Sequence, residues 1–237
     1  MNTRRVGLVA GVVIGWAASL PAAEPCANAP AAEDGFVSMF NGRDLAGWEG
    51  LPGWWEVRDG AIVVESTEAK PGERSHYLYW KGGEPADFDV RFQFRMAGHA
   101  NTGLQFRSLA KPNWDTWGYQ ADLDSAGKYT GCLYQHKRGV VALRGQKVLF
   151  DAQGKKTVST FGDPAELLKV VKSDDWNEYR VLAVGPNITL WINGMRMCEV
   201  EDHQPEFALP KGILALQMHR GPPMKAEFKN LRIKVLR

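Results

Sequence analysis

Residues 117–124, WGYQADLD, place one amide and two carboxylates at every second position of an otherwise mostly apolar stretch. This alternation is typical of a β-strand that turns one face to the core and the other to water. The wet face would carry Gln120, Asp122 and Asp124. Amides and carboxylates hydrogen-bond hydroxyl groups, and a carboxylate can also carry a proton or bind a divalent cation.

Three further segments alternate apolar residues with residues that could do chemistry. They are TGLQFRS at 102–108, CLYQHK at 132–137 and GILALQMHRG at 212–221. If these strands lie in one sheet with the first, their polar faces form a single surface. The residues that they would add to that surface are Gln105, Arg107, Tyr134, His136, Gln217 and His219.

Such planar polar groups are typical of a groove that binds a sugar or catalyses a reaction on one. They pair with hydroxyl groups, while nearby tryptophans stack on rings. Trp114 and Trp117 flank the first strand, and Trp117 is the predicted stacking residue. The alternative is an ordinary solvated face, because every antiparallel sheet of this kind needs one. The unusual share of Gln, His and Arg leaves both interpretations open.

Several other chemistries lack their sequence signatures. No HExxH or CxxC spacing indicates a metal site, and the five histidines are scattered. No serine nucleophile elbow is present, and no run of paired glutamates of the jelly-roll glucanase type occurs. No cofactor is evident. Asp122 and Asp124 are the candidate ligands for a divalent cation.

The elements that would position these residues are mostly short strands. DVRFQFRM at 89–96 alternates cleanly, and Asp-Gly and Asn-Gly turns separate other alternating pairs. One convincing helix spans 163–172, with Asp163 as N-cap and Pro164 in its first turn. Ten or more strands with one short helix predict an all-β fold, a two-sheet jelly-roll sandwich.

The N-terminus has the pattern of a secretory signal. Arg4 and Arg5 precede an apolar run that is too short for a membrane span, and small residues follow it. We therefore predict a signal peptide over 1–23 and export to the periplasm or the cell exterior. Lipid anchoring at Cys26 is disfavoured, because a Glu and a Pro occupy the small-residue positions before it.

We predict a short linker at 24–34 and a single domain over 35–237. Without the signal peptide, basic and acidic residues are equal in number, so the protein has no electrostatic footprint for nucleic acid. Cys132 and Cys198 could form one disulfide or remain two buried thiols. The oligomeric state is left open.

Taken together, eight motifs resemble the 3-keto-disaccharide hydrolase domain family, in the family's order and over nearly all of Gly35–Arg237. The resemblance implies an often bacterial, exported domain with a concanavalin-like lectin/glucanase sandwich. One departure is informative: many members have a Glu where this chain has Gly118, and this chain carries Asp122 instead. The motifs are FVSMFNGRDLAGWEG, WWEVRDGAIV, DFDVRFQFRM, NTGLQFRS, GYQADLD, DWNEYRV, LWINGM and GILALQMHRGPPMKAEFKNLRIK.

The resemblance also implies a reaction, the hydrolysis of a glycoside whose third carbon is already a ketone. The ketone acidifies the C2 proton, so the leaving group on C1 can depart by elimination before water adds. This route needs a base, a donor for the enolate oxygen and an acid for the leaving oxygen. The candidates are Asp122 or His219 as base, Arg107 as clamp, His136 or Tyr134 as acid, and Gln105, Gln120, Gln217 and Trp117 as substrate contacts.

Two other classes of function fit the same sequence. A non-catalytic, lectin-like module would use the same fold and groove to bind carbohydrate. A sandwich that docks to a partner in a larger assembly would need no groove at all.

Overall fold

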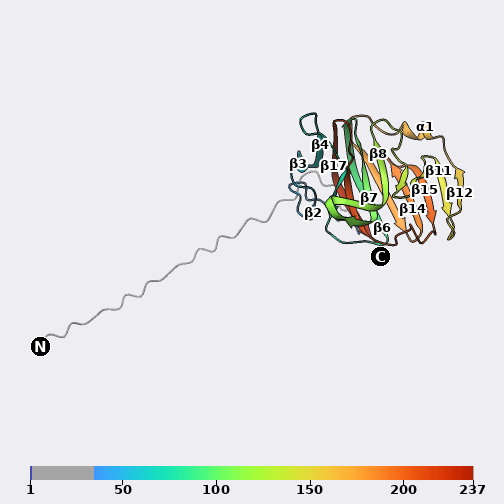
Figure 1. Ribbon diagram of the computed structural model, residues 1–237, viewed down its shortest axis with the longest axis horizontal. Coiled ribbons are helices and arrows are strands. Elements are labelled where there is room, and N and C mark those ends of the chain that lie inside the picture. Colours follow the sequence, from blue (N-terminus) through green and yellow to red (C-terminus); the bar gives the residue numbers. More distant parts are fainter. Residues whose placement is uncertain (2–34, 237) are drawn as a thin grey trace.

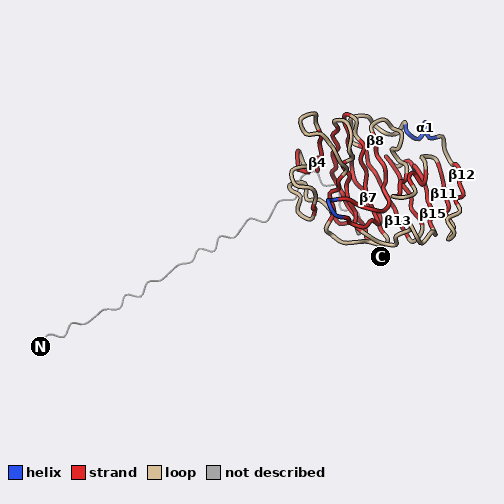
Figure 2. The backbone as a smooth tube through the Cα atoms, viewed as in Figure 1, coloured by secondary structure: helices blue, strands red, loops and turns tan. Residues whose placement is uncertain are grey.

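Two β-sheets pack face to face over a shared apolar core in the computed structural model of this chain (Figure 1). The structure describes Met1 and residues 35–236. The predicted signal peptide and linker lie outside residues 35–236, so they stay predictions. Figure 2 shows how little of the described chain is helical.

The larger sheet has ten strands. They are β1 (Val37–Ser38), β3 (Trp55–Arg58), β4 (Ala61–Ser66), β6 (Phe88–Gly98), β11 (Gln146–Phe150), β12 (Lys156–Thr160), β13 (Asn177–Val184), β14 (Asn187–Ile192), β15 (Met195–Asp202) and β17 (Met224–Val235). Their order is β12-β11-β15-β14-β13-β6-β17-β4-β3, and β1 pairs with β17.

The smaller sheet has seven strands. They are β2 (Trp48–Glu49), β5 (His76–Trp80), β7 (Asn101–Lys111), β8 (Asp115–Asp124), β9 (Leu133–Gln135), β10 (Gly139–Ala142) and β16 (Ile213–Met218). Their order is β10-β9-β8-β7-β16-β5-β2. All four segments that the sequence singled out for their polar faces contribute strands to this one sheet.

The core between the sheets comes from the apolar half of each alternation. On β6, Phe92 and Phe94 are almost completely buried, and Phe92 stacks on Tyr179 of β13 with ring centroids 5.4 Å apart. On β8, Tyr119 and Ala121 face the same core from the other sheet. Because successive strand residues point to opposite faces, the alternate residues Gln120 and Asp122 are turned outward.

The predicted helix is present but shorter than expected. α1 spans Pro164–Leu168, and Asp163 caps it by accepting hydrogen bonds from the next turn's amides, as predicted. Beyond Leu168 the chain continues in tight turns, in which the amides of Lys169 and Val171 each donate to a carbonyl three residues back, and Asn193 Nδ2 donates to the carbonyl of Val170 at 2.7 Å. Within residues 35–236, no helix is long and apolar enough to cross a membrane.

Candidate functional site

A cleft of about 450 Å³ lies on the outer face of the seven-stranded sheet. Most of the predicted residues meet there, from β8, β9 and β16 and from the turns that follow β9 and β16. The cleft is lined by Ser75, Tyr77, Asn101, Asp115, Gln120, Asp122, Tyr129, Tyr134, His136, Gly139, Val140, Gln217 and His219.

The strand register explains this convergence. Gln105 of β7 is paired with Gln120 of β8, and Gln120 with Tyr134 of β9. On the other side of β7, Gln217 of β16 is paired with Tyr77 of β5. Paired residues of neighbouring antiparallel strands point to the same face, so these side chains form rows across the sheet.

Five amide and hydroxyl side chains form a continuous chain of four hydrogen bonds with Gln120 at its centre. Ser108 Oγ donates to Gln105 Oε1 at 2.9 Å, and Gln105 Nε2 donates to Gln120 Oε1 at 2.8 Å. Gln120 Nε2 donates to Gln217 Oε1 at 2.9 Å, and Gln217 Nε2 donates to the Tyr77 hydroxyl at 2.9 Å. We call this chain the amide ladder.

Asp122 is joined to the amide ladder and faces the cleft. Its Oδ1 accepts a hydrogen bond from Gln120 Nε2 at 2.7 Å, and only 8% of the residue is exposed. Burial raises the pKa of its carboxyl to about 7, the Gln120 hydrogen bond opposes this rise, and the charge of Asp124 adds to it. A carboxyl that titrates near neutral pH can serve as a general acid or base.

Tyr134 and His136 stand side by side on β9 and its turn. Their rings meet edge to face with centroids 5.3 Å apart. Burial lowers the pKa of His136, whose Nδ1 lies 3.1 Å from the carbonyl oxygen of Gly118. Burial also raises the pKa of Tyr134, and the Asp122 carboxylate adds to this rise. Both rings are thus mainly neutral at pH 7, and the phenol is a proton donor in the cleft.

His219 reaches the cleft from the turn that follows β16. It is half-buried, and its Nδ1 lies 2.6 Å from the carbonyl oxygen of Arg220. That contact requires a proton on Nδ1, so the neutral imidazole presents Nε2 as an acceptor. His219 thus lines the same cleft as Gln120, although it lies one residue beyond the end of β16.

Arg107 is not in the cleft, and its predicted place there was wrong. A β-bulge follows Phe106, where the pairing shifts from Phe106–Tyr119 to Leu109–Trp117, and Arg107 has a φ of 43°. The extra residue re-aims the side chain. The guanidinium donates to the carbonyl oxygens of Ala86 and Gly185 at 2.8 and 2.7 Å, and it contacts Asp87, all outside the cleft.

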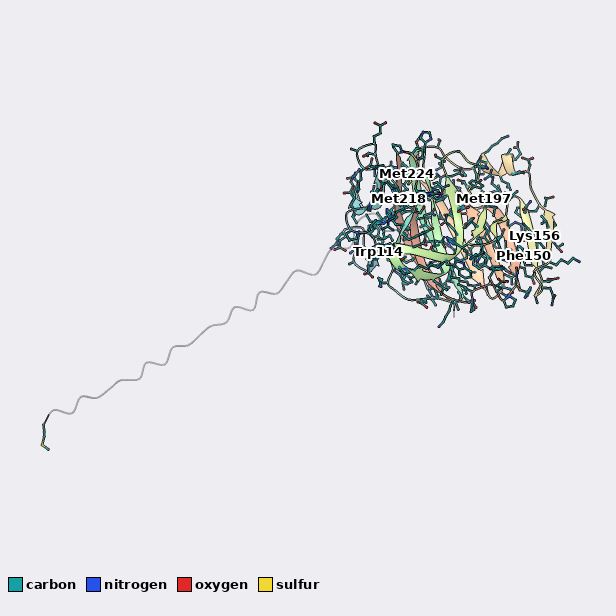
Figure 3. The ribbon with its side chains drawn as sticks, viewed as in Figure 1. Trp114, Phe150, Lys156, Met197, Met218 and Met224 are labelled. Atoms are coloured by element: carbon teal, nitrogen blue, oxygen red, sulfur yellow. The ribbon has the colours of Figure 1, made fainter. Side chains whose placement is uncertain are left out.

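Two other predicted contacts are displaced from the cleft surface. Trp117 has the strand parity of Tyr119, not that of Gln120, so it does not line the cleft. Gln105 has the correct parity, but as a member of the amide ladder it is fully buried and does not line the cleft. Trp114 is the tryptophan beside the cleft instead: its ring packs on Tyr79 with centroids 5.6 Å apart. Figure 3 shows Trp114 at the end of the molecule away from Phe150 and Lys156.

Asp124 is committed to its own loop. Its carboxylate accepts hydrogen bonds from the backbone amides of Lys128, Tyr129 and Thr130 at 2.7–3.1 Å. Among residues 35–236, no three His, Cys, Asp or Glu side chains gather closely enough to hold a metal ion. The pair Asp122 and Asp124 therefore does not fit a divalent cation site. Cys132 and Cys198 are free and buried.

Four further residues line the cleft that the sequence did not lead us to expect: Tyr77, Asn101, Asp115 and Tyr129. Tyr77 had a readable signal, because HYLYW at 76–80 places alternate tyrosines on one face. Asn101 and Tyr129 lie at the ends of strands and in loops, where alternation gives no direction.

A family model for a 3-keto-alpha-glucoside-1,2-lyase-like domain matches residues 35–234. The chain belongs to this family. A curated relative, the 3-keto-disaccharide hydrolase of Bacteroides thetaiotaomicron (strain ATCC 29148), is 24% identical over 102 residues, covering 39% of this chain and 34% of the relative. The match thus spans about a third of that relative's length.

Two solved structures share the family's fold at low sequence identity. A protein from Parabacteroides distasonis ATCC 8503, provisionally named a glycosyl hydrolase, has a TM-score of 0.56 and 20% identity over 86% of this chain and 95% of its own. The carbohydrate-binding module CBM66 from Bacillus subtilis has a TM-score of 0.51 and 14% identity over 78% of this chain and 94% of its own. These similarities confirm the predicted sandwich.

The structure explains why this member of the family has a glycine at residue 118. A Cβ built on Gly118 would lie 2.1 Å from Ser108 Oγ and 2.7 Å from the carbonyl oxygen of Arg107. The bulge that turns Arg107 away has therefore filled the space that a side chain would need. Asp122, four residues further along this strand, is a carboxylate that lines the cleft.

Proposed function

We propose that this chain is an exported hydrolase of 3-keto-glycosides that cleaves the glycosidic bond by elimination followed by hydration. Family membership supports a carbohydrate-active domain of the glycoside hydrolase type. The observation that carries the finer proposal is Asp122, a buried carboxyl that lines the cleft and has a pKa of about 7. The proposal rests on this proton carrier, because elimination begins with removal of a proton.

The spacing of the cleft carboxylates favours elimination over a two-carboxylate mechanism. Asp115 and Asp122 both line the cleft, but they lie seven residues apart on one continuous strand. At about 3.3 Å per residue they are separated by about 23 Å. Glycosidases with paired carboxylates need a separation of about 5–10 Å. The nearer Asp124 is occupied by its loop.

In the proposed reaction Asp122 takes the C2 proton, and the electron pair of that C–H bond forms the C1–C2 double bond. The C1–O bond breaks, and the leaving oxygen receives a proton from Tyr134 or from a protonated His136. Water then adds to C1 while a proton returns to C2, so the sum of the two steps is hydrolysis. Removal of the C2 proton places negative charge on the ketone oxygen until the C1–O bond breaks, and the spare amide proton of Gln217 would stabilise that charge.

The direct test compares two forms of one glycoside with the purified domain, one oxidised at C3 and one not. We expect release of the leaving group from the 3-keto form only. Release from both forms would contradict elimination. A parallel reaction in deuterium oxide should place deuterium at C2 of the product, because the proton removed from C2 is replaced from solvent. Release without this label would also contradict the mechanism.

A lectin-like function is the competing proposal. The same sandwich occurs in a carbohydrate-binding module, and the cleft is lined by polar side chains of the kind that bind hydroxyl groups. A binding module would bind both glycosides in calorimetry and release the leaving group from neither. Saturable binding of both glycosides without release of the leaving group would therefore support the binding module and contradict the hydrolase.

A further inference from the structure

The orientation of every amide in the amide ladder follows from the charge of Asp122. A carboxylate repels an amide oxygen, so Gln120 must turn Nε2 toward Asp122 Oδ1, 2.7 Å away. Gln120 Oε1 then faces Gln105, so Gln105 must turn its Nε2 toward Gln120 to donate a hydrogen bond. On the other side, Gln217 must turn its Oε1 toward Gln120 to accept the hydrogen bond from Gln120 Nε2. The ladder therefore has one polarity.

Gln120 has no amide proton left for a substrate. An amide nitrogen carries two protons, and Gln120 Nε2 donates one to Asp122 at 2.7 Å and the other to Gln217 at 2.9 Å. Its oxygen accepts from Gln105 at 2.8 Å, and only 4% of the residue is exposed. The hydroxyl-binding role that the sequence suggested for Gln120 does not agree with these contacts.

The same geometry gives the two carboxyl oxygens of Asp122 different roles. Oδ1 accepts the Gln120 proton, so it cannot carry a proton of its own along that direction. Among residues 35–236, no donor reaches Oδ2, and the residue lines the cleft. When Asp122 is protonated, the proton belongs on Oδ2.

We infer that Gln120 is a positioning residue whose two internal hydrogen bonds keep Asp122 Oδ1 an acceptor and leave Oδ2 as the atom that exchanges a proton with the cleft. This deepens the proposed function by naming the reacting oxygen, but it holds for Asp122 as a titrating group whatever the substrate. A glycine supports the arrangement: a Cβ at Gly103 would lie 2.9 Å from Gln120 Cγ and would push its side chain off Gln217.

The cleft holds other groups that titrate, and a variant must leave them unchanged. From the strands and loops that surround Asp122 these groups are Tyr77, Asp115, Asp124, Tyr129, Tyr134, His136 and His219. Replacing Gln120 by an apolar residue changes none of these charges. Any change in the titration of Asp122 would then come from the lost hydrogen bond.

The test is a carbon-detected NMR titration of the Asp122 carboxyl in the protein without substrate. In wild type we expect a midpoint near 7. Gln120→Leu removes a donor that stabilises the charged carboxylate and keeps the site buried, so the midpoint should rise by about one unit or more. Gln120→Met, with a more flexible side chain of similar volume, gives the same measurement if the leucine variant does not fold.

Gln135→Leu is the matched control. Gln135 is another fully buried glutamine of the same sheet, but it is paired with Tyr119 and points to the core face, with no contact to Asp122. Its variant should leave the Asp122 midpoint within about 0.2 units of wild type. The inference is overturned if Gln120→Leu and Gln120→Met leave the midpoint unchanged or lower it, or if Gln135→Leu raises it equally. Because no substrate is present, this result is independent of whether 3-keto-glycosides are hydrolysed.

Discussion

Arg107 and Asp87 form a buried ion pair at 3.2 Å that connects the bulge of the seven-stranded sheet to the start of β6 in the other sheet. Asp87 also accepts a hydrogen bond from the Gly185 amide at 2.8 Å. The pair thus joins the two layers outside the cleft. Its role in this structure is to hold the sandwich together.

Arg107→Met should therefore lower stability and spare catalysis. Removing one partner of a buried pair costs about 3–5 kcal/mol, and about 1 kcal/mol shifts Tm by about 2–4 °C at this size. We expect Tm to fall by at least about 6 °C, while kcat on a 3-keto-glycoside, measured well below Tm, stays within about twofold of wild type. Lys81→Met breaks the exposed pair with Glu49 and should move Tm by about 1 °C or less. If Arg107→Met kept its Tm but lost its turnover, the structural role of Arg107 would be wrong and a role in the cleft chemistry would be supported.

Asp122→Asn should remove most of the turnover without changing the shape of the site. General base catalysis typically contributes about 10²–10⁴-fold, so kcat should fall at least tenfold. A base acts in its ionised form, so wild-type kcat/KM should rise with pH through about 7 and then level off. Asp115→Asn, at the other carboxylate that lines the cleft, should keep the wild-type rate within about threefold. Equal losses in both variants would contradict the assignment of Asp122.

The sequence could predict the parts of this site that depend on alternation alone. Gln120, Asp122 and Gln217 keep their period of two through β8 and β16, and pairing then brings them to one face. The prediction for Arg107 failed because the bulge adds one residue in the middle of β7, and the residues at the bulge, FRSL at 106–109, include no glycine or proline to mark it. Up to Gln105 the parity is right, and two residues later it no longer applies.

β12 could not be predicted from the sequence, for a different reason. Every residue of β12 is exposed, so KTVST has no buried face and no alternation to read. It is a strand only because β11 offers it hydrogen bonds. α1 is also shorter than its sequence pattern predicts: after Leu168 the chain forms tight turns, and side chains from β13 and from the turn before β15 bind carbonyls of that segment.

Trp114 and Trp117 offer a matched pair for locating the edge of the cleft. Trp114 and its neighbour Asn113 both have positive φ, and Arg74 Nη1 holds this turn by donating to the Asn113 carbonyl at 2.6 Å. The ring is thereby presented on Tyr79, next to the cleft residue Tyr77. If the leaving group of a glycoside stacks there, Trp114→Ala should raise KM about fivefold for an aryl or sugar leaving group. Trp117→Ala should leave KM unchanged, and a larger effect of Trp117→Ala would contradict this placement.

Asp122 also makes the protein less stable at alkaline pH. Its folded pKa of about 7 exceeds the ordinary value of 3.8, so the folded chain holds this proton to a higher pH than the unfolded chain. The stability that it contributes is fully present below about pH 4 and is lost as the pH rises to about 7. Asp122→Asn cannot ionise, so its Tm should equal that of wild type at pH 4 and exceed it by at least about 4 °C at pH 8. If the difference in Tm between Asp122→Asn and wild type were the same at pH 4 and pH 8, ionising Asp122 would cost the folded protein no stability, and this prediction would be wrong.

His76 should act in the opposite direction. It is buried beside Trp54 and Trp55, its Nδ1 accepts a hydrogen bond from Trp55 Nε1 at 3.3 Å, and burial lowers its pKa from 6.5 to about 4. The unfolded chain therefore takes up this proton first, and the stability that neutral His76 contributes is lost as the pH falls from about 6.5 to 4.

The opposite effects of Asp122 and His76 on the pH dependence of stability should nearly cancel in wild type between pH 4 and 6.5. A variant at either residue should reveal the effect of that residue alone. His76→Gln keeps an acceptor for Trp55 but cannot titrate, so its Tm relative to wild type should rise as the pH falls from 6.5 to 4. Over the same range, the Tm of Asp122→Asn relative to wild type should rise as the pH increases. Because all other groups titrate alike in variant and wild type, scanning calorimetry of the three proteins isolates each residue. Two difference curves with the same slope would be incompatible with a neutral buried His76 and a protonated Asp122 in one fold.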